Sequence, residues 1–331
     1  MAKDREMEDA LAEAVRRHMP GAEGISDLRH LTGGASKETW AFRARTADGS
    51  EAPLVLRRAR GGDRDPVFTI DVALETEAVV MARAQLAGVP VPKVEFVLDP
   101  KDELGSGYVM EFVDGETIAR KILRDQEFAE ARKVMAYQCG EILAKIAATD
   151  TAGIDELARV TPAQQIARIE KIYRAFDEPF PAVELVFKWL ERNMPDGGVM
   201  GLAHGDFRNG NLIVGPDGVR AVIDWEIPHV GDPLEDVGWL CTNVWRFGVS
   251  DKPVGGFGER EDLFAGYEAA GGGPVDAKRV HFWEVFGCLN WAVICMMMTR
   301  RHLLGAVESL ELITIGRRAM EGEIDLLNLI G

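Results

Sequence analysis

The pattern of apolar residues changes near residue 114, and this change constrains the fold more than any other feature of the chain. Before it, short runs with strand-like alternation are separated by Gly, Asp and Ser turns. One segment, residues 71–88, instead places apolar residues at helical spacing. After it, helical patterns dominate except around residues 199–227. The sequence therefore predicts a strand-rich lobe over residues 1–113 and a helical lobe over residues 114–331.

The residues that end the helical segment of the first lobe support this division. The helical segment ends at Gly88, a residue that suits a helix C-terminus, and the VPVP sequence that follows stops any continuation. The strand-like runs occupy residues 28–34, 39–45, 53–58, 93–99 and 107–113.

Composition limits the class of protein. A chain of 331 residues with 47% hydrophobic content can bury a sizeable core. Its formal net charge of -16 argues against a nucleic-acid partner, because phosphate backbones are bound through clustered Lys and Arg. The cysteines lack CxxC spacing, so they indicate neither a disulfide framework nor a zinc site, and a reducing cytoplasm is expected. They are Cys139, Cys241, Cys288 and Cys295.

Neither an export signal nor a membrane span is predicted. The first residues mix acids and bases at helical spacing and lack the apolar core of a signal peptide. The most apolar run, Val285 to Met298, is interrupted by Asn290 and is shorter than the roughly 20 residues that a membrane helix needs. We therefore predict that this run is a buried core helix.

Short strands around residues 199–227 carry an unusual polar cluster. HGDFRNGN, residues 204–211, holds Asp206 and Asn211, and Asp224 follows in VIDWE. Carboxylate and amide oxygens suit Mg²⁺, which is usually held by one or two carboxylates together with substrate phosphates. A further carboxylate could orient a hydroxyl nucleophile and accept its proton. Asp or Asn alone could equally cap a turn or a helix, but the full set favours phosphoryl transfer.

These motifs, together with GDPLEDVGWL, resemble the aminoglycoside phosphotransferase-like branch of the protein-kinase-like fold. The resemblance implies an α+β, bilobal fold with an antiparallel sheet in the first lobe. It makes Asp206 the catalytic aspartate, and Asn211 and Asp224 the magnesium ligands. It also implies that His204 braces the loop and that Asp232 supports the site from behind.

The first lobe resembles the same family. In that family a turn covers the phosphates, a basic residue on the third strand pairs with a helix glutamate, and a hinge reads adenine. Here LTGGASKETW, residues 31–40, would be the turn, and Arg57 and Glu77 would be the ion pair. The turn would present the backbone N–H groups of Gly33, Gly34, Ala35 and Ser36 to phosphate. The hinge would be Met110, Glu111 and Phe112.

The chain departs from the family pattern in two places: the GGAS turn lacks the full protein-kinase glycine pattern, and the ion pair has a different cation. The expected third-strand lysine is an arginine, whose planar fork pairs bidentately where lysine offers a point charge. Arg58 is an alternative cation, but strand alternation points it to the other face of the sheet. Glu75 competes with Glu77 for the pairing. In addition, the chain lacks an APE-like segment after Asp224, which argues against a regulated protein kinase.

The sequence thus predicts a small-molecule kinase that uses ATP, or GTP, with Mg²⁺ and phosphorylates a hydroxyl group. Similarity to phosphotransferase domains related to those fused to acyl-CoA dehydrogenases implies a hydroxyacyl-CoA or a hydroxy acid as the acceptor. An aminoglycoside, a nucleotide-binding pseudokinase module and a metal-dependent phosphohydrolase are the alternatives. Arg208 and Glu226 are predicted substrate contacts, whereas Asn209 is predicted to be a loop residue whose replacement is mild.

Overall fold

Five strands form an antiparallel sheet in the first lobe, in the order β1-β2-β3-β5-β4. The computed structural model describes residues 2–31, 37–59, 71–198, 200–305 and 309–331. The strands are β1 (Ala22–Leu31), β2 (Lys37–Thr46), β3 (Glu51–Ala59), β4 (Val94–Val97) and β5 (Gly107–Glu111). The sheet confirms the α+β class. The division at residue 113 stays a prediction, although the last strand of the sheet ends close to it.

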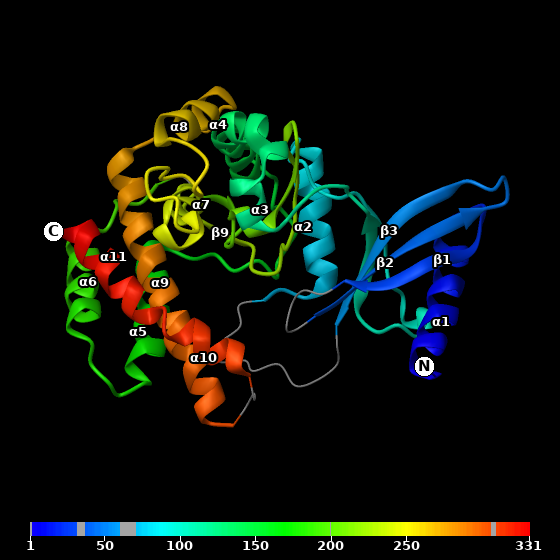
Figure 1. The fold of residues 1–331 in the computed structure, drawn as a ribbon, viewed down its shortest axis with the longest axis horizontal. Coiled ribbons are helices and arrows are strands. Elements are labelled where there is room, and N and C mark those ends of the chain that lie inside the picture. The colour runs from blue at the N-terminus through cyan, green and yellow to red at the C-terminus, as the bar shows by residue number, and fades with distance from the viewer. Residues whose placement is uncertain (1, 32–36, 60–70, 199, 306–308) are drawn as a thin grey trace.

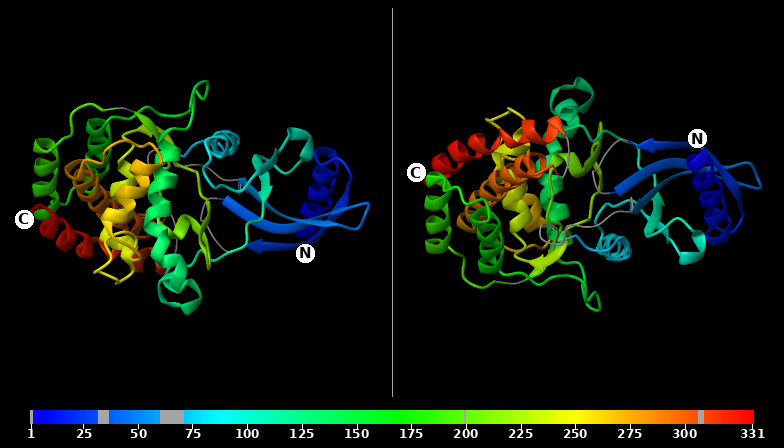
Figure 2. Two further views of the ribbon diagram at one scale, coloured as in Figure 1. Left: turned by 90° about the horizontal axis from the view of Figure 1, so that it is seen from above. Right: turned by 90° about the horizontal axis from the view of Figure 1, so that it is seen from below.

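The two faces of the sheet have different neighbours because successive strand residues point to opposite sides. One face packs on α1 (Ala2–His18) through a small core that includes Leu11, Phe42 and Leu56. On the other face, Arg57 of β3 lies opposite Tyr108 of β5 and points toward α2. Figure 2 shows α1 on the outer side of the sheet, away from the helical lobe.

Helix α2 (Leu74–Leu86) joins the sheet to the helical lobe (Figure 1). Its buried side chains belong to the large core that also holds the residues of the second lobe. The backbone reinforces this junction, because the Val72 N–H donates to the Glu226 carbonyl at 3.0 Å and the Val222 N–H donates to the Pro90 carbonyl at 2.8 Å. The helix thereby fixes Glu77 in front of the polar cluster.

The second lobe consists mainly of helices. They are α3 (Ala119–Arg124), α4 (Ala129–Ala147), α5 (Pro162–Arg174), α6 (Pro181–Arg192), α7 (Glu235–Cys241), α8 (Arg260–Ala269), α9 (Ala277–Leu303), α10 (Leu310–Gly316) and α11 (Ala319–Ile330). Two short ribbons carry the polar cluster at their ends: β6 (Gly201–Ala203) with β9 (His229–Gly231), and β7 (Leu212–Gly215) with β8 (Gly218–Val222). Single 3₁₀ turns lie at Pro100–Asp102, Gln126–Phe128, Asn209–Asn211 and Asn243–Arg246.

Helix α9 contains the apolar run predicted as a core helix. The helix is 27 residues long and, by length and composition alone, could cross a membrane, so the shortness of the run does not by itself exclude a span. Burial explains the apolar composition of this helix, because 61% of its most apolar 18-residue stretch lies inside the fold. It packs against α6, α7, α10 and α11, which confirms its place in the core.

Candidate active site

The loop between β6 and β7 begins with two residues held from below by Asp236 of α7. The backbone N–H groups of His204 and Gly205 donate to the Asp236 carboxylate at 2.6 and 3.0 Å. Gly205 has a φ of +84°, and a Cβ there would lie 2.5 Å from the Ile227 carbonyl oxygen. Only glycine fits both conditions. The chain therefore turns sharply at this point and presents Asp206 to the site.

His204 is fully buried and braces the loop through both ring nitrogens. The Asp206 N–H donates to Nδ1 at 3.2 Å, so Nδ1 carries no proton and Nε2 donates to the Ile223 carbonyl at 3.1 Å. Burial lowers the pKa of His204 to about 4, which keeps the ring neutral. The histidine links the Asp206 loop to the strand end that carries Asp224, and it has no proton-transfer position of its own.

The Asp206 carboxylate accepts hydrogen bonds from three side chains. Trp239 Nε1 donates at 2.9 Å, Asn211 Nδ2 at 2.8 Å, and Arg208 Nε at 3.1 Å to each oxygen. Burial raises the pKa of Asp206, while Arg208 and Trp239 oppose that rise. The carboxylate is therefore oriented and is a better proton acceptor than a free aspartate.

Asn211 and Asp224 form the candidate magnesium position. The Asn211 amide nitrogen is used by Asp206, which leaves its carbonyl oxygen as a possible ligand. Asp224 adopts a φ of +68°, an uncommon conformation for a non-glycine residue and one that recurs at functional sites. Within the described ranges, His, Cys, Asp and Glu nowhere gather in threes as metal ligands. One carboxylate and one amide fit Mg²⁺ that completes its coordination with phosphates and water.

A charge cluster surrounds this position, with Lys37, Arg57 and Glu77 from the first lobe and Asp224 and Glu226 from the second. Arg57 Nε lies 3.0 Å from Glu77 Oε1, so the predicted partners are brought together. A second guanidinium nitrogen lies 2.5 Å from Asp224 Oδ1. Burial would lower the pKa of Arg57, but the three carboxylates together raise it, so the side chain stays charged. Arg57 thus binds the metal-site aspartate as well as the helix glutamate.

The competing pairings lie elsewhere. Arg58 points to the other face and contacts Glu38, while Glu75 accepts from the Ser106 hydroxyl on the exposed side of α2. Glu77 is fully buried and also accepts from the Tyr108 hydroxyl at 3.1 Å. The choice of Arg57 and Glu77 over these neighbours therefore agrees with the geometry.

Lys37 is the cluster residue that the sequence reasoning missed. It is 5% exposed, and its Nζ lies 3.0 Å from Glu226 and 3.5 Å from Glu77. Glu226 is the nearest carboxylate partner of Lys37, and its role as a substrate contact stays a prediction. A basic residue directly after a glycine-containing turn was the available signal, but the search for a third-strand cation passed over it.

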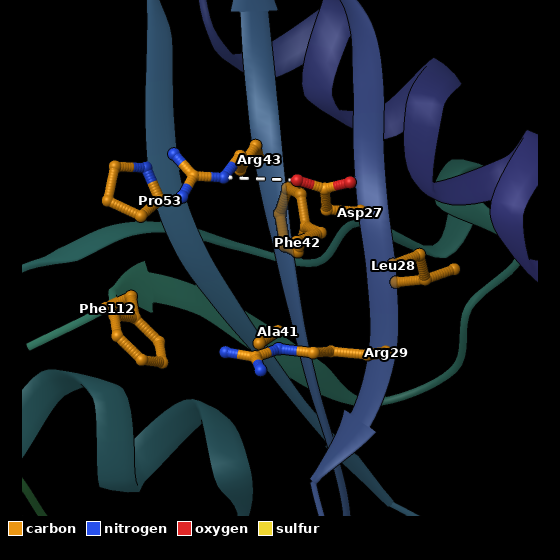
Figure 3. Close-up of a pocket in the computed structure, with 8 residues that line it drawn as sticks. All are labelled: Asp27, Leu28, Arg29, Ala41, Phe42, Arg43, Pro53 and Phe112. Carbon is orange, nitrogen blue, oxygen red and sulfur yellow. Dashed lines mark ion pairs between the residues drawn. The ribbon is translucent and has the colours of Figure 1, made fainter. Parts of the chain in front are cut away.

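The predicted hinge borders a cavity of about 470 Å³ on the site-facing side of the sheet (Figure 3). Phe112 and Arg29 point into it, with the guanidinium 6.0 Å from the ring centre. Ala41 leaves room at its centre, and Arg43 is held aside by Asp27 at 3.3 Å. The N–H groups of Glu111 and Phe112 donate to the carbonyls of Lys93 and Pro53, so these two donors are already used.

Met110 is half-buried and sits opposite Val55 in the sheet. The predicted phosphate turn, Gly33, Gly34, Ala35 and Ser36, lies outside the described residues.

Two expectations about polar residues are corrected. Asp232 was expected to support the loop, but its carboxylate binds Arg279 and Trp283 of α9, and the support comes from Asp236. Asn209 was expected to be mild on replacement, yet it is fully buried and its amide donates to the carbonyls of Trp245 and Gly255 at 3.0 and 2.8 Å. Asn209 therefore joins the loop to two later segments, a long-range role that local sequence cannot reveal.

Comparisons with known proteins agree with this arrangement. The phosphotransferase enzyme family matches residues 27–272. Acyl-CoA dehydrogenase family member 10 of Mus musculus is 29% identical over 320 residues, which cover 90% of this chain and 29% of that protein. Acyl-CoA dehydrogenase family member 11 of Pongo abelii is 27% identical over 330 residues, which cover 86% of this chain and 42% of that protein. The chain therefore spans less than half the length of these relatives.

Solved structures share the fold. A provisionally assigned aminoglycoside phosphotransferase from Ralstonia eutropha superposes with a TM-score of 0.74 at 23% identity, covering 97% of each chain. Aminoglycoside phosphotransferase APH(4)-Ia, in a ternary complex with AMP-PNP and hygromycin B, gives a TM-score of 0.64 at 17% identity and covers 97% of this chain and 98% of its own. The protein-kinase-like fold is thereby confirmed. The chain belongs to the phosphotransferase enzyme family.

Proposed function

We propose that this protein transfers the γ-phosphoryl group of ATP, with Mg²⁺, to a hydroxyl of an anionic metabolite, either a hydroxy acid or a hydroxyacyl-CoA. The observation that carries the acceptor class is a cavity of about 700 Å³ in the helical lobe, which three arginines and two carboxylates line. Its wall is connected to Asp206 by a row of tryptophans. The use of ATP is supported by the AMP-PNP bound in a protein of the same fold.

The chemistry follows from the side chains around Asp206. The acceptor hydroxyl would bind beside this carboxylate, which takes the proton as the oxygen attacks the γ-phosphorus. The new O–P bond forms while the bond from that phosphorus to the leaving ADP oxygen breaks. Asn211 and Asp224 would hold Mg²⁺, which neutralises charge on the phosphates. The cavity beside Phe112 would take the adenine.

The tryptophan row leads from Asp206 to this cavity. Trp239, which donates to Asp206, has its ring centre 5.1 Å from that of Trp245, and Trp245 lies 5.3 Å from Trp291 in the cavity wall. Arg208 stacks over Trp245 at 4.6 Å. A ligand in the cavity would thus rest against the same aromatic wall that orients the catalytic carboxylate.

The cations of the cavity favour an anionic acceptor. Arg120, Arg317 and Arg318 line it, together with Glu321 and with Asp325, whose carboxylate accepts from the Asn243 amide. Arg318 is paired with Glu321 at 3.1 Å, but among the described residues Arg120 and Arg317 have no carboxylate partner. In a chain with a net charge of -16, unpaired arginines at a cavity indicate a carboxylate, phosphate or pyrophosphate ligand. The long match to acyl-CoA dehydrogenase family members supports an acyl-CoA in particular.

An aminoglycoside is the second candidate. The negative charge of the whole chain would attract a polycation, and a protein of the same fold is bound to hygromycin B. The arginines of the cavity oppose this candidate because they would repel an ammonium group. The two candidates therefore differ in the sign of charge that the acceptor carries.

An acceptor panel tests the proposal. ADP release and a phosphorylated product, detected by mass spectrometry, would be measured with hydroxyacyl-CoAs, hydroxy acids, aminoglycosides, choline and homoserine, and without any acceptor. We expect turnover with the anionic compounds. We also expect Arg317→Ala to raise the KM for that acceptor at unchanged KM for ATP, with the exposed Arg301→Ala as the control. Turnover with aminoglycosides alone would reverse the choice, and rapid ADP release without an acceptor would indicate a phosphohydrolase.

A further inference from the structure

The charge cluster contains two cations on adjacent strands, and they point to the same face of the sheet. Lys37 pairs with Ala59 and Thr39 pairs with Arg57 in the register of β2 and β3. Lys37 and Arg57 are therefore diagonal neighbours. Each contacts a different oxygen of Glu77, Lys37 at Oε2 and Arg57 at Oε1. A family member with a single cation beside the helix glutamate would need only one of these two strand positions.

The two cations are engaged to different degrees. Arg57 lies between carboxylates: Glu77 at 3.0 Å, Asp224 at 2.5 Å and Glu226 at 3.6 Å. Its planar fork joins α2 to the end of β8. The Lys37 ammonium contacts two carboxylates and not three, Glu226 at 3.0 Å and Glu77 at 3.5 Å. Its flexible stem lets an ammonium exchange partners more readily than a guanidinium held on several sides.

The net charge of the cluster indicates that Lys37 is needed for an anion to bind there. The cluster holds three carboxylates and two cations, so it carries one negative charge in excess. Without Lys37 the excess would be larger, and a nucleotide polyphosphate approaching Asp224 would be repelled. Glu226, the closest partner of Lys37, is 32% exposed, so it is the partner that can release the ammonium to a ligand.

We propose that Lys37 is the cation that contacts the nucleotide phosphates, and that Arg57 is a positioning residue that holds Glu77 and Asp224. This inference rests on the proposed use of ATP. It reassigns the role that the sequence resemblance gave to Arg57. It also gives Glu226 a function, namely to hold the lysine in place before the nucleotide binds.

The test measures the affinity of purified variants for ATP, ADP and adenosine by calorimetry in the presence of Mg²⁺. Lys37→Met leaves the buried Glu77 and the half-buried Glu226 without their ammonium partner, so Lys37→Met/Glu226→Gln accompanies it to restore the charge and keep the fold. A matched control is Lys93→Met/Glu95→Gln, which removes an exposed lysine–glutamate pair on the first lobe, with Lys93 57% exposed. Thermal unfolding checks that each variant is folded.

We expect the Lys37 double variant to bind ATP and ADP at least tenfold more weakly while its affinity for adenosine stays within about twofold, since adenosine lacks phosphates and a charge-assisted bond is worth about 1.5–3 kcal/mol. Lys37→Arg should restore part of the loss, and Arg57→Lys should lower kcat more than nucleotide affinity. A folded double variant that binds ATP like the wild type would overturn the proposal for Lys37 alone. Failure of the wild type to bind any nucleotide would overturn the proposed function and, with it, the role of Lys37.

Discussion

The Asp206 loop and the charge cluster face the same site but are built in different ways. The loop spans residues 204–211, and several of its bonds join residues within that stretch, such as Asn211 to Asp206. The cluster draws Lys37, Arg57, Glu77 and Glu226 from four separate segments. A local arrangement of this kind can be recognised as a motif, whereas a long-range one becomes visible only in the fold.

We expect the Asp206 loop to act in phosphoryl transfer and not in nucleotide binding. Asp206→Asn tests this and has the largest expected effect of the substitutions. The amide keeps the bond from Trp239 but cannot accept the hydroxyl proton. We expect kcat to fall by about 10²–10⁴ while the affinity for ATP changes little. Steady-state kinetics and calorimetry measure the two quantities, and Asp217→Asn, on an exposed turn, is the control. Loss of ATP affinity equal to the loss of kcat would mean that the loop also binds the nucleotide.

Asp224 lies where the loop and the cluster meet, so Asp224→Ala should affect binding more than chemistry. Its removal eliminates the candidate metal carboxylate and one partner of Arg57. We expect about tenfold or more weaker binding of ATP in the presence of Mg²⁺, since a hydrogen bond to a charged group is worth about 1.5–3 kcal/mol. Affinity measured with and without Mg²⁺ separates the two causes. If the variant lost affinity equally in both conditions, the magnesium role would be wrong and Arg57 would be responsible.

The same contrast explains what the sequence could predict. The lobes, helix α2, the core position of α9, and the proximity of Asp206 and Asn211 follow from periodicity and short-range motifs. Asp236 and Asn209 could not be assigned, because their partners are His204 and Trp245 in distant segments. Lys37 had a local signal in the glycine-containing segment before it, but its partner Glu226 is distant as well. The choice of Glu77 over Glu75 was possible because helical spacing decides which side chain faces the sheet. The length of the apolar run alone could not decide the place of α9, because the helix continues beyond that run at both ends.

Asn209→Ala tests whether the loop depends on long-range bonds despite its local motif. The substitution leaves the carbonyls of Trp245 and Gly255 without their donor in the interior. We expect the free energy of unfolding to fall by about 1–3 kcal/mol, measured by urea denaturation. The control is Asn193→Ala, which removes one exposed bond to the Trp189 carbonyl. Equal stability of the Asn209 variant and wild type would restore the original expectation that this residue is mild.

Two buried histidines show the contrast on a smaller scale. His204 has a pKa lowered to about 4 because the effect of burial outweighs the opposing effect of Asp224. His229 is also buried, and burial lowers its pKa, but Glu235 at 3.1 Å raises it to about 9 overall. A proton on His229 is therefore held in the folded protein up to about pH 9, whereas the unfolded chain releases it near pH 6.5. This pair should stabilise the fold below pH 6.5 and lose that contribution as the pH rises to about 9.

The measurable consequence is a slope in stability between pH 7 and 9. The folded state binds more protons than the unfolded state in this window, so the free energy of unfolding falls with rising pH, by on the order of 1 kcal/mol per pH unit. Burial and the neighbouring Glu235 raise the pKa of Asp236 only to about 7, so that group adds little above it. We expect His229→Gln to flatten the slope and the exposed His30→Gln to leave it unchanged, by denaturant titration across the window. If the slope persisted in His229→Gln, another group would bind the proton, and the His229–Glu235 ion pair would not explain the pH dependence of stability.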